Sequence, residues 1–334
     1  MAHLDGYSRP INYLRVSVTD RCNLRCQYCM PPEGIPWIPH DTVLRYEEIA
    51  LIVRAAAELG INRIRLTGGE PLVRLGMADL VRMLRAVPGV EDLAMTTNGI
   101  LLPRYARDLA EAGLDRVNIS LDTLRPERFQ AITRGGRLED VLAGIKAAHQ
   151  AGLEPVKINT VVMRGTNDDE VVDLAWRTME PGWNVRFIEW MPVGTTAPAD
   201  DSTWRGMVVT ADEMRQRIEI ALGDLEPAMT ATGSGPARYY RLPGAKGTIG
   251  FITPVSEHFC YHCNRLRLTA DGQLRPCLLS DREIDLRTPL RQGVDVPQIK
   301  ELILQAIDSK PLQHHLNQCG RGRPENRVMS QIGG

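Results

Sequence analysis

The chain has 334 residues, a length that favours one large domain with a smaller appendage. Its 40 basic and 41 acidic side chains leave a net charge of −1, so no global field points to a nucleic acid or a membrane as partner. We find neither a signal peptide nor an apolar run that could span a bilayer, and therefore expect a cytoplasmic protein with reduced cysteines.

The first two-thirds of the chain alternates short apolar strands with amphipathic helices. Strands are predicted at Tyr13–Thr19, Arg63–Thr67, Asp92–Asn98, Arg116–Asp122, Val156–Met163 and Asn184–Trp190. Helices are predicted at Tyr46–Leu59, Pro103–Ala112, Leu138–Ala151 and Asp168–Met179. Such alternation is typical of parallel βαβ units. Six units predict an α/β fold, an incomplete (β/α)6 barrel of the TIM type.

One face of several predicted strands is polar, although parallel strands covered on both faces are normally apolar throughout. Four of these strands also carry a cation inside an apolar run: Arg15, Arg65, Lys157 and Arg186. Any one of them could pair with a carboxylate such as Asp122 or Glu189, or lie in water at a strand end. Four together predict a polar lumen that binds a polyanion, and phosphate matches the arginine fork best.

Six of the seven cysteines fall into two triads. Cys22, Cys26 and Cys29 have C-x3-C-x2-C spacing, and Cys260, Cys263 and Cys277 have C-x2-C-x13-C spacing, which leaves Cys319 as an ordinary cysteine. Three thiolates can hold three irons of a four-iron cluster and leave the fourth iron open to a small molecule. Zinc is the alternative, and it is stronger at the second triad, where His258 and His262 lie nearby.

The run Cys22–Pro31 resembles the cluster motif of the radical S-adenosylmethionine (SAM) enzymes. The loop Thr67–Pro71, with its paired glycines, resembles the element that holds the methionine end of SAM in that superfamily. Thr96–Gly99 and Asn118–Asp122 end two further strands, where barrel enzymes gather active-site groups.

The pattern changes after Trp190. A short helix is expected near Ala211–Ala221, and the loose stretch Asp224–Pro236 predicts a boundary between residues 1–223, the barrel, and 224–334, a smaller α+β domain with the second cluster. In this second part we expect a hairpin of Arg238–Leu242 with Thr248–Thr253. Arg265 and Arg267 would share one strand face beside the cysteines, and the turn at Asp271-Gly272 would return the chain to Cys277.

Together these motifs resemble the GTP 3′,8-cyclase family (molybdenum cofactor biosynthesis protein A), from Arg15 to the final Gly333-Gly334. The resemblance implies two 4Fe-4S clusters and SAM as cofactors. It implies that SAM yields a 5′-deoxyadenosyl radical, which takes hydrogen from C3′ of GTP, and that the ribose then attacks C8 of guanine. The product would be (8S)-3′,8-cyclo-7,8-dihydro-GTP, formed in the first step of molybdenum cofactor biosynthesis.

The resemblance also implies roles for individual residues. SAM contacts are Tyr28, Gly69, Ser120 and Met191. GTP contacts are Arg15, Arg65, Thr96, Lys157, Arg265, Leu266 and Arg267. Catalytic roles fall to Arg15, Arg265, Arg267, Gly333 and Gly334. The segment Arg74–Met77 departs from the family pattern. This departure affects where the next helix is expected to begin.

The implied partners, besides GTP, are an electron donor and the next pathway enzyme, cyclic pyranopterin monophosphate synthase, with a homodimer as a candidate assembly. Two alternatives stay open on the residues alone. One is a radical SAM enzyme that modifies a peptide and carries an auxiliary cluster. The other is a non-catalytic zinc or iron–sulfur protein.

Overall fold

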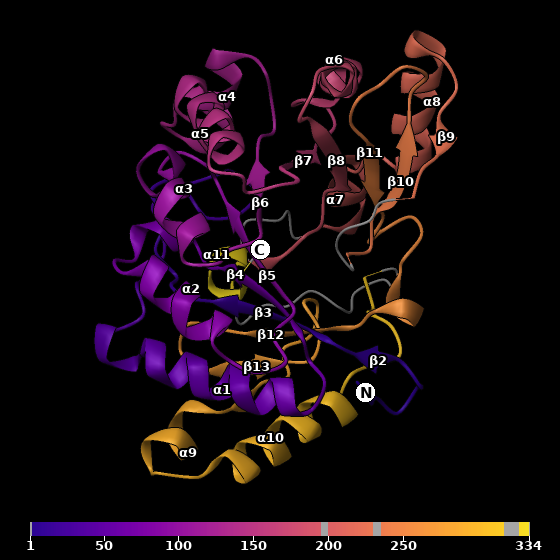
Figure 1. Cartoon of the computed structure of the whole chain (residues 1–334). Coiled ribbons are helices and arrows are strands. Elements are labelled where there is room, and N and C mark those ends of the chain that lie inside the picture. The colour runs from indigo at the N-terminus through magenta and orange to yellow at the C-terminus, as the bar shows by residue number, and fades with distance from the viewer. Residues whose placement is uncertain (1, 195–199, 230–234, 317–326, 334) are drawn as a thin grey trace.

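The computed structural model describes residues 2–194, 200–229, 235–316 and 327–333 (Figure 1). Its centre is a run of six parallel strands, hydrogen-bonded in chain order: β3 (Tyr13–Ser17), β4 (Arg63–Thr67), β5 (Asp92–Thr97), β6 (Arg116–Ser120), β7 (Lys157–Val162) and β8 (Asn184–Glu189). The order of the strands is open at both ends. This confirms the predicted incomplete (β/α)6 barrel.

Helices connect these strands and cover one face of the sheet. They are α1 (Tyr46–Glu58), α2 (Met77–Arg85), α3 (Leu102–Glu111), α4 (Pro126–Thr133), α5 (Leu138–Gln150) and α6 (Val171–Trp176). The helix predicted over Asp168–Met179 is broken, because 3-10 turns at Asp168–Glu170 and Arg177–Met179 flank α6. Glu170 at the first break is buried and accepts hydrogen bonds from Thr123 and Leu124.

Apolar strand residues face these helices and form the main core. Leu14 and Val16 on β3 and Ile64 and Leu66 on β4 are almost completely buried in one apolar cluster. Because side chains alternate along a strand, the intervening polar residues must point to the opposite face. The polar face predicted from the sequence is therefore the inner face of the barrel.

Residues beyond 224 extend the same sheet at both edges. On one side β11 (Ile249–Ile252) pairs in parallel with β8, followed by antiparallel β10 (Arg238–Arg241) and β9 (Glu226–Pro227). On the other side β12 (Arg265–Leu268) pairs in parallel with β3, followed by antiparallel β13 (Gln273–Arg275) and β14 (Ile284–Asp285). Both predicted hairpins are present. The division into residues 1–223 and 224–334 stays a prediction.

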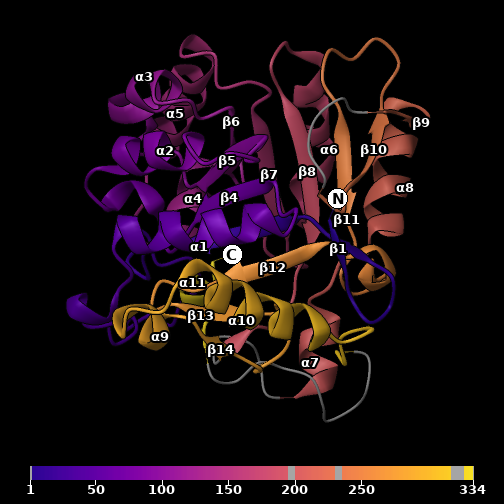
Figure 2. The same ribbon diagram turned by 60° about the horizontal axis from the view of Figure 1, so that its bottom comes forward.

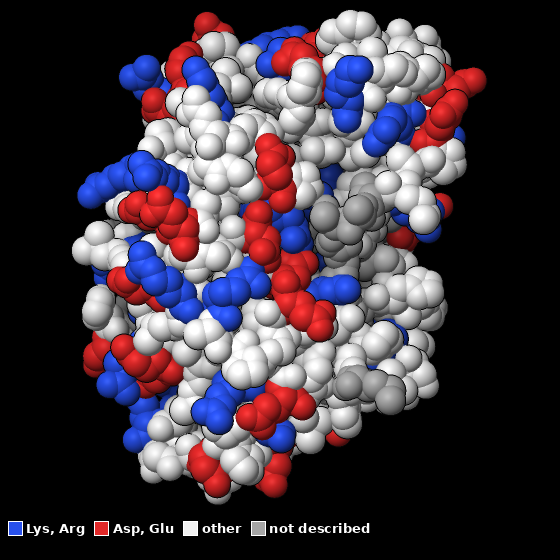
Figure 3. All heavy atoms as spheres, viewed as in Figure 1, with Lys and Arg blue, Asp and Glu red and all other residues white. Residues whose placement is uncertain are grey.

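The remaining elements are β1 (His3–Leu4), β2 (Pro10–Ile11), α7 (Asp201–Gly206), α8 (Ala211–Leu222), α9 (Arg287–Arg291), α10 (Val296–Asp308) and α11 (Met329–Ile332). Helix α10 packs against α1 below the sheet (Figure 2). None of the described helices is both long and apolar enough to cross a membrane. Basic and acidic side chains lie side by side on the face that Figure 3 shows.

Candidate active site

Three arginines lie in one row across the inner face of the barrel. Arg267 on β12 is the register partner of Arg15 on β3, which in turn is the partner of Arg65 on β4. Like charges on neighbouring strands repel one another. Arg65 is 5 % exposed, and its Nε donates a 2.9 Å hydrogen bond to the hydroxyl of Tyr13. This row concentrates positive charge, and within the part of the chain that the structure describes no carboxylate forms an ion pair with Arg65.

The opposite wall carries a second polar group. Asn118 pairs with Lys157, and Ser120, Asn159 and Arg186 lie in one register across β6, β7 and β8. Several buried atoms of the two walls have no hydrogen-bond partner: Arg65 Nη1, Arg186 Nε, Thr96 Oγ1, Asn118 Oδ1 and Asn159 Oδ1. Buried polar atoms are nearly always paired in folded proteins. A polar ligand in the lumen would satisfy this set.

The electrostatics of the lumen point to a negatively charged ligand. Burial lowers the pKa of Arg15 to about 10, and the charges of Arg65, Arg265 and Arg186 act in the same direction. Burial also lowers the pKa of Lys157 to about 7, with Arg186 and Arg116 as the next causes. Cations on facing strands therefore lie close enough to disfavour one another's charge. A polyanion would relieve this repulsion.

The first cysteine triad lies in a loop that is anchored to the C-terminal end of α4. The backbone N–H of Gln27 donates to Ile132 at 2.9 Å, and Arg134 donates to the carbonyl of Met30 at 2.7 Å. Burial raises the pKa of the Cys22 thiol to about 11 and that of Cys29 to about 12. The charge of Cys22 contributes to the raised pKa of both Cys26 and Cys29, so the three thiols lie near one another.

The paired glycines hold this loop against the end of β4. The backbone N–H of Gly69 donates to the carbonyl of Thr19 at 2.8 Å, and a Cβ on Gly69 would lie 2.4 Å from the carbonyl oxygen of Arg21. Only glycine fits there. Glu70 is buried and accepts hydrogen bonds from Leu72, Thr97 and Asn98, which joins the loops after β4 and β5. Burial raises the pKa of Glu70 to about 7.

The four predicted SAM contacts lie around this loop. The hydroxyl of Tyr28 donates to the buried carboxylate of Asp122 at 2.8 Å, at the end of β6. Ser120 lies two residues before that carboxylate, on the row described above. Met191 packs into a small apolar cluster with Ile332 of α11 and with Cys277 of the second triad. This cluster places Cys277 of the second triad beside the segment that carries α11.

The second triad combines burial with positive charge. Burial alone would raise the pKa of Cys263, but Arg265 and Lys310 outweigh it and lower this pKa to about 6. The thiolate is the form that binds metals. Lys310 is held in place by hydrogen bonds from its ammonium group to the carbonyls of Arg265 and Pro276.

The spacing of the donor groups bears on which metal they fit. In the part of the chain that the structure describes, no three His, Cys, Asp or Glu side chains gather tightly enough to hold a single ion. The ring of His258 lies against those of Tyr261 and His314. A zinc site needs all its donors around one point, whereas an iron–sulfur cluster spreads its cysteine ligands over several irons. The all-cysteine donor set of each triad matches the thiolate ligands of an iron–sulfur cluster.

The C-terminal segment enters the lumen between the triads. The carbonyl of Gly333 accepts hydrogen bonds from Arg267 at 2.5 Å and from Arg15 at 3.4 Å, and the backbone N–H of Ser330 donates to the Cys29 thiol. Gly333 has φ +80°, and a Cβ there would lie 2.7 Å from Thr67. Figure 1 shows α11 beside the inner strands. Gly334 and Cys319 lie outside the described residues.

Among the predicted GTP contacts, Arg15, Arg65 and Arg267 lie on the inner face of the barrel, whereas Leu266 does not. Leu266 is completely buried in the outer core, so its side chain points away from the lumen and only its backbone could contribute. Sequence reasoning missed Tyr13, which alternates with Arg15 and could have been found from that pattern. It also missed Arg134 and Arg327, for which no local signal exists.

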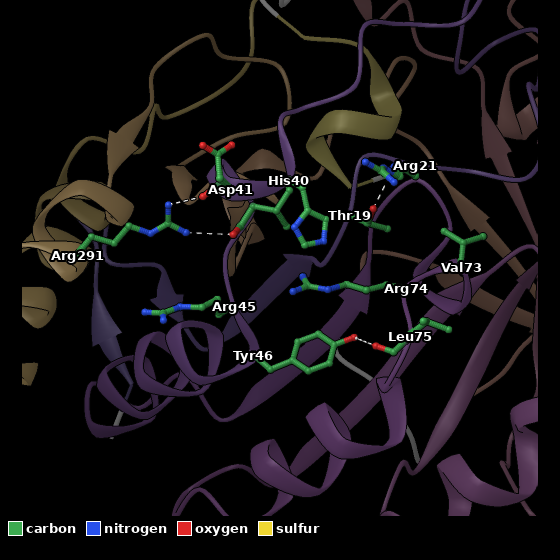
Figure 4. A pocket seen from close by; sticks show the side chains of 11 residues that line it. Thr19, Arg21, His40, Asp41, Arg45, Tyr46, Val73, Arg74, Leu75 and Arg291 are labelled. Carbon is green, nitrogen blue, oxygen red and sulfur yellow. Dashed lines mark hydrogen bonds between the residues drawn. The ribbon is translucent and has the colours of Figure 1, made fainter.

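A separate cavity of about 790 Å³ lies beside the start of the cysteine loop, between Thr19, Tyr46 and Leu75 (Figure 4). Arg74 crosses it, stacks on the ring of Tyr46 at 4.3 Å and donates to the carbonyls of Val18 and Leu44. Arg74, the first residue of the segment that departs from the family pattern, therefore supports the start of the cysteine loop by linking Val18 to Leu44. Gly76, at φ +75°, precedes the first residue of α2.

Comparison with known proteins agrees with this geometry. Residues 16–175 match the family model of the radical SAM superfamily, and residues 183–316 match that named Molybdenum Cofactor Synthesis C. Among solved structures, Streptococcus suis SuiB bound to S-adenosylmethionine has a TM-score of 0.60 at 14 % identity, covering 96 % of this chain and 77 % of SuiB. This likeness shows the radical SAM fold.

Curated relatives identify the family within the radical SAM superfamily. The GTP 3′,8-cyclase of Pelotomaculum thermopropionicum is 56 % identical over 99 % of both chains. That of Heliobacterium modesticaldum is 55 % identical over 99 % of this chain and 100 % of its own length. At such identity the two alternatives from the sequence, a peptide-modifying enzyme and a non-catalytic metal protein, lose their support. The chain belongs to the GTP 3′,8-cyclase family of radical SAM enzymes, which carry SAM and iron–sulfur chemistry.

Proposed function

We propose that this chain converts GTP into (8S)-3′,8-cyclo-7,8-dihydro-GTP in the first step of molybdenum cofactor biosynthesis. The observation that carries the proposal is the cationic lumen between two cysteine triads. A triphosphate supplies negative charge opposite the clustered cations of the lumen, and its oxygens match the unpaired donors Nη1 of Arg65 and Nε of Arg186. The names of the relatives support GTP as the nucleotide.

We assign the first cluster to Cys22, Cys26 and Cys29, and the SAM contacts to Tyr28, Gly69, Ser120 and Met191. When bound, the reduced cluster supplies the electron that cleaves SAM and so starts the radical chemistry. The chain's own part is to position the reactants. Gly69 lets the backbone approach closely, and Asp122 orients the hydroxyl of Tyr28.

We assign a second cluster to Cys260, Cys263 and Cys277, which would bring the guanine base to its own open iron. The lowered pKa of Cys263 and the neighbouring Arg265 and Arg267 support this assignment, because they favour a thiolate and an anionic ligand together. The carbonyl of Gly333, held by Arg267, would then lie against the bound nucleotide.

Three partners complete the proposal. The reaction needs an electron donor, because one electron must enter the first cluster for each SAM cleaved. The product passes to the cyclic pyranopterin monophosphate synthase of the pathway. A homodimer is the assembly that we propose, and the sedimentation behaviour of the purified protein would test it.

The decisive experiment is made without oxygen. The protein is reconstituted with iron and sulfide, given dithionite, SAM and GTP, and assayed for 5′-deoxyadenosine and for a GTP-derived product. We expect both to form in step. Cys22→Ser should abolish both, whereas Cys260→Ser should keep some SAM cleavage and lose the product. Deoxyadenosine formed without any loss of GTP in the wild type would overturn the substrate assignment.

A further inference from the structure

Tyr239 reaches the cationic lumen from a strand that lies outside the barrel proper. It is located on β10, opposite Gly250 of β11, which is in turn the register partner of Arg186 on β8. Register partners in a sheet direct their side chains to the same face. Tyr239 therefore ends the inner row that begins at Ser120 and runs through Asn159 and Arg186.

Gly250 leaves the space that this arrangement needs. A Cβ at position 250 would lie 3.0 Å from Cγ of Arg186 and 3.1 Å from Cε1 of Tyr239. Without that methyl group, the ring of Tyr239 and the stem of Arg186 lie together over the β11 backbone. The absence of a side chain in the middle of a strand is thus explained by close packing of its two neighbours.

Tyr239 contacts two of the lumen cations. Arg186 donates a hydrogen bond to its hydroxyl group, and the ammonium nitrogen of Lys157 lies 5.5 Å from the centroid of its ring. Both interactions stabilise positive charge, the first through the oxygen lone pairs and the second through the negative face of the ring. One side chain therefore holds the cations of two neighbouring strands.

The charged groups that face Lys157 come from four other strands: Arg65 on β4, Asp92 on β5, Arg116 on β6 and Arg186 on β8. Three of these four are cationic. The carboxylate of Asp92 is shared, because Arg116 binds it at 2.5 Å. The aromatic face of Tyr239 adds a favourable contact to the Lys157 ammonium group among these like charges.

We propose that Tyr239 is a positioning residue for the phosphate-binding wall: it orients Arg186 through its hydroxyl group and keeps Lys157 charged through its ring, so that both meet the triphosphate. The inference rests on the proposed function, because it takes a nucleoside triphosphate as the ligand. It adds a residue from the C-terminal part of the chain to a wall otherwise built by β6, β7 and β8.

The pKa of Lys157 gives the inference a specific signature. Burial and the nearby arginines lower this pKa to about 7, so the ammonium group loses its proton near neutral pH. GTP binds the charged form, and its affinity should fall as the pH rises through that value. Removal of the aromatic ring destabilises the charged form further, which moves the fall in affinity to lower pH.

The test uses the reconstituted holoenzyme and measures GTP affinity by equilibrium dialysis between pH 6 and 9. Tyr239→Phe loses only the hydrogen bond and should weaken GTP binding about five-fold. Tyr239→Ala loses the ring as well and should weaken it by roughly ten- to a hundred-fold, with the pH midpoint displaced downward. Phenylalanine should thus restore the midpoint but not the full affinity.

Tyr240→Phe is the matched control. Its ring lies against Arg215 and Phe251, away from the lumen, and Tyr240→Phe should bind GTP like the wild type. Gly250→Ala is a second variant that should weaken binding while Tyr239 itself is unchanged, because its added Cβ would crowd both Tyr239 and Arg186.

Equal affinity and an equal pH midpoint in Tyr239→Ala and the wild type would overturn the inference while the proposed function stands. A wild-type protein that holds its clusters and fails to bind GTP would overturn both. SAM cleavage with dithionite in the absence of GTP separates these cases, because Tyr239 contacts neither triad and its variants should leave that rate unchanged.

Discussion

Lysine 157 shows that a binding residue can weaken the fold that holds it. Its side chain is buried among arginines, and its pKa of about 7 in the folded protein lies below the usual value of 10.5. The unfolded chain binds the proton more tightly than the native state does. Stability is therefore reduced fully below pH 7 and recovers as the pH rises from 7 towards 10.5.

Lys157→Met should accordingly stabilise the nucleotide-free protein by roughly 1–4 kcal/mol at pH 6, with a smaller gain at pH 9. The same change should weaken GTP binding. Thermal unfolding at the two pH values measures the first effect. Lys146→Met, an exposed lysine on α5, is the control and should change neither quantity. A loss of stability at pH 6 in Lys157→Met would contradict the account.

Gly69 is the opposite case, because no other amino acid fits at its position. Because a Cβ there would lie 2.4 Å from a backbone carbonyl, Gly69→Ala should displace the cysteine loop, cost about 1–3 kcal/mol and lower SAM cleavage severely. Calorimetry and deoxyadenosine assays check this. Gly206→Ala, with nothing within 4 Å of its Cβ, should behave as wild type. An active Gly69→Ala would show that the loop adapts.

The segment that carries α11 is anchored before it enters the lumen. Arg327 forms ion pairs with Asp271 of the β12–β13 turn and with Glu283, at 2.9 and 2.6 Å. Burial alone would lower the pKa of Arg327, but the hydrogen bonds and charges of Glu283 and Asp271 outweigh it and raise this pKa, so the loss of Arg327 is costly. The geometry of Gly333 in the lumen therefore depends on a contact some distance from it.

Arg327→Gln should release the segment and reduce GTP conversion at least ten-fold while both clusters still form, because Asp271 would lose its ion-pair partner and Glu283 would keep only Arg275. The loss of stability should be about 2–4 kcal/mol. Product assays and iron content provide the measurement. Arg282→Gln, at an exposed position of the same region, is the control. Full conversion by Arg327→Gln would rule out the anchoring role.

Local patterns predicted the central elements well. The strand predicted at Arg63–Thr67 has those bounds in the structure, and the other five end within two residues of theirs, because alternation and flanking glycines act over short distances. The pairing of β12 with β3 was not predictable. Arg265 of β12 and Tyr13 of β3 are register partners, although most of the chain separates them in sequence. Neither strand carries a sequence signal that identifies the other as its neighbour.

The candidate site divides in the same way. Cysteine spacing indicated both triads. Strand alternation predicted that Arg15 and Arg65 lie on the inner face, and the structure places them there. Tyr239 looked like an ordinary residue of a hairpin, because its contacts depend on which sheet edge that hairpin joins. The hydrogen bond of Tyr28 to Asp122 likewise links segments whose proximity only the assembled barrel creates.

In the molecule as a whole, the strands at both edges of the main sheet come from the C-terminal part of the chain. Removal of residues 224–334 would expose β3 and β8 and uncover apolar core next to Leu266 and Leu268, which are completely buried. Exposed strand edges with apolar faces favour aggregation. The boundary predicted at residue 223 therefore separates sequence segments that share their core.

A fragment of residues 1–223 should accordingly fail to fold on its own. We expect it to aggregate, and co-expression with residues 224–334 should restore a soluble complex. Size-exclusion chromatography and thermal unfolding distinguish the outcomes. A monomeric fragment with one cooperative transition would instead establish an independent barrel domain.

The order of strands along the chain also sets a schedule for biosynthesis. The ribosome completes β3 to β8 first, and the two strands that flank them, β11 and β12, emerge only later. At about 5–20 residues per second, that interval lasts several seconds. During it the first cysteine loop is accessible from both open edges, and α11 does not yet exist to cover Cys29. The nascent chain thus offers iron–sulfur carriers a natural loading window, which closes when translation ends.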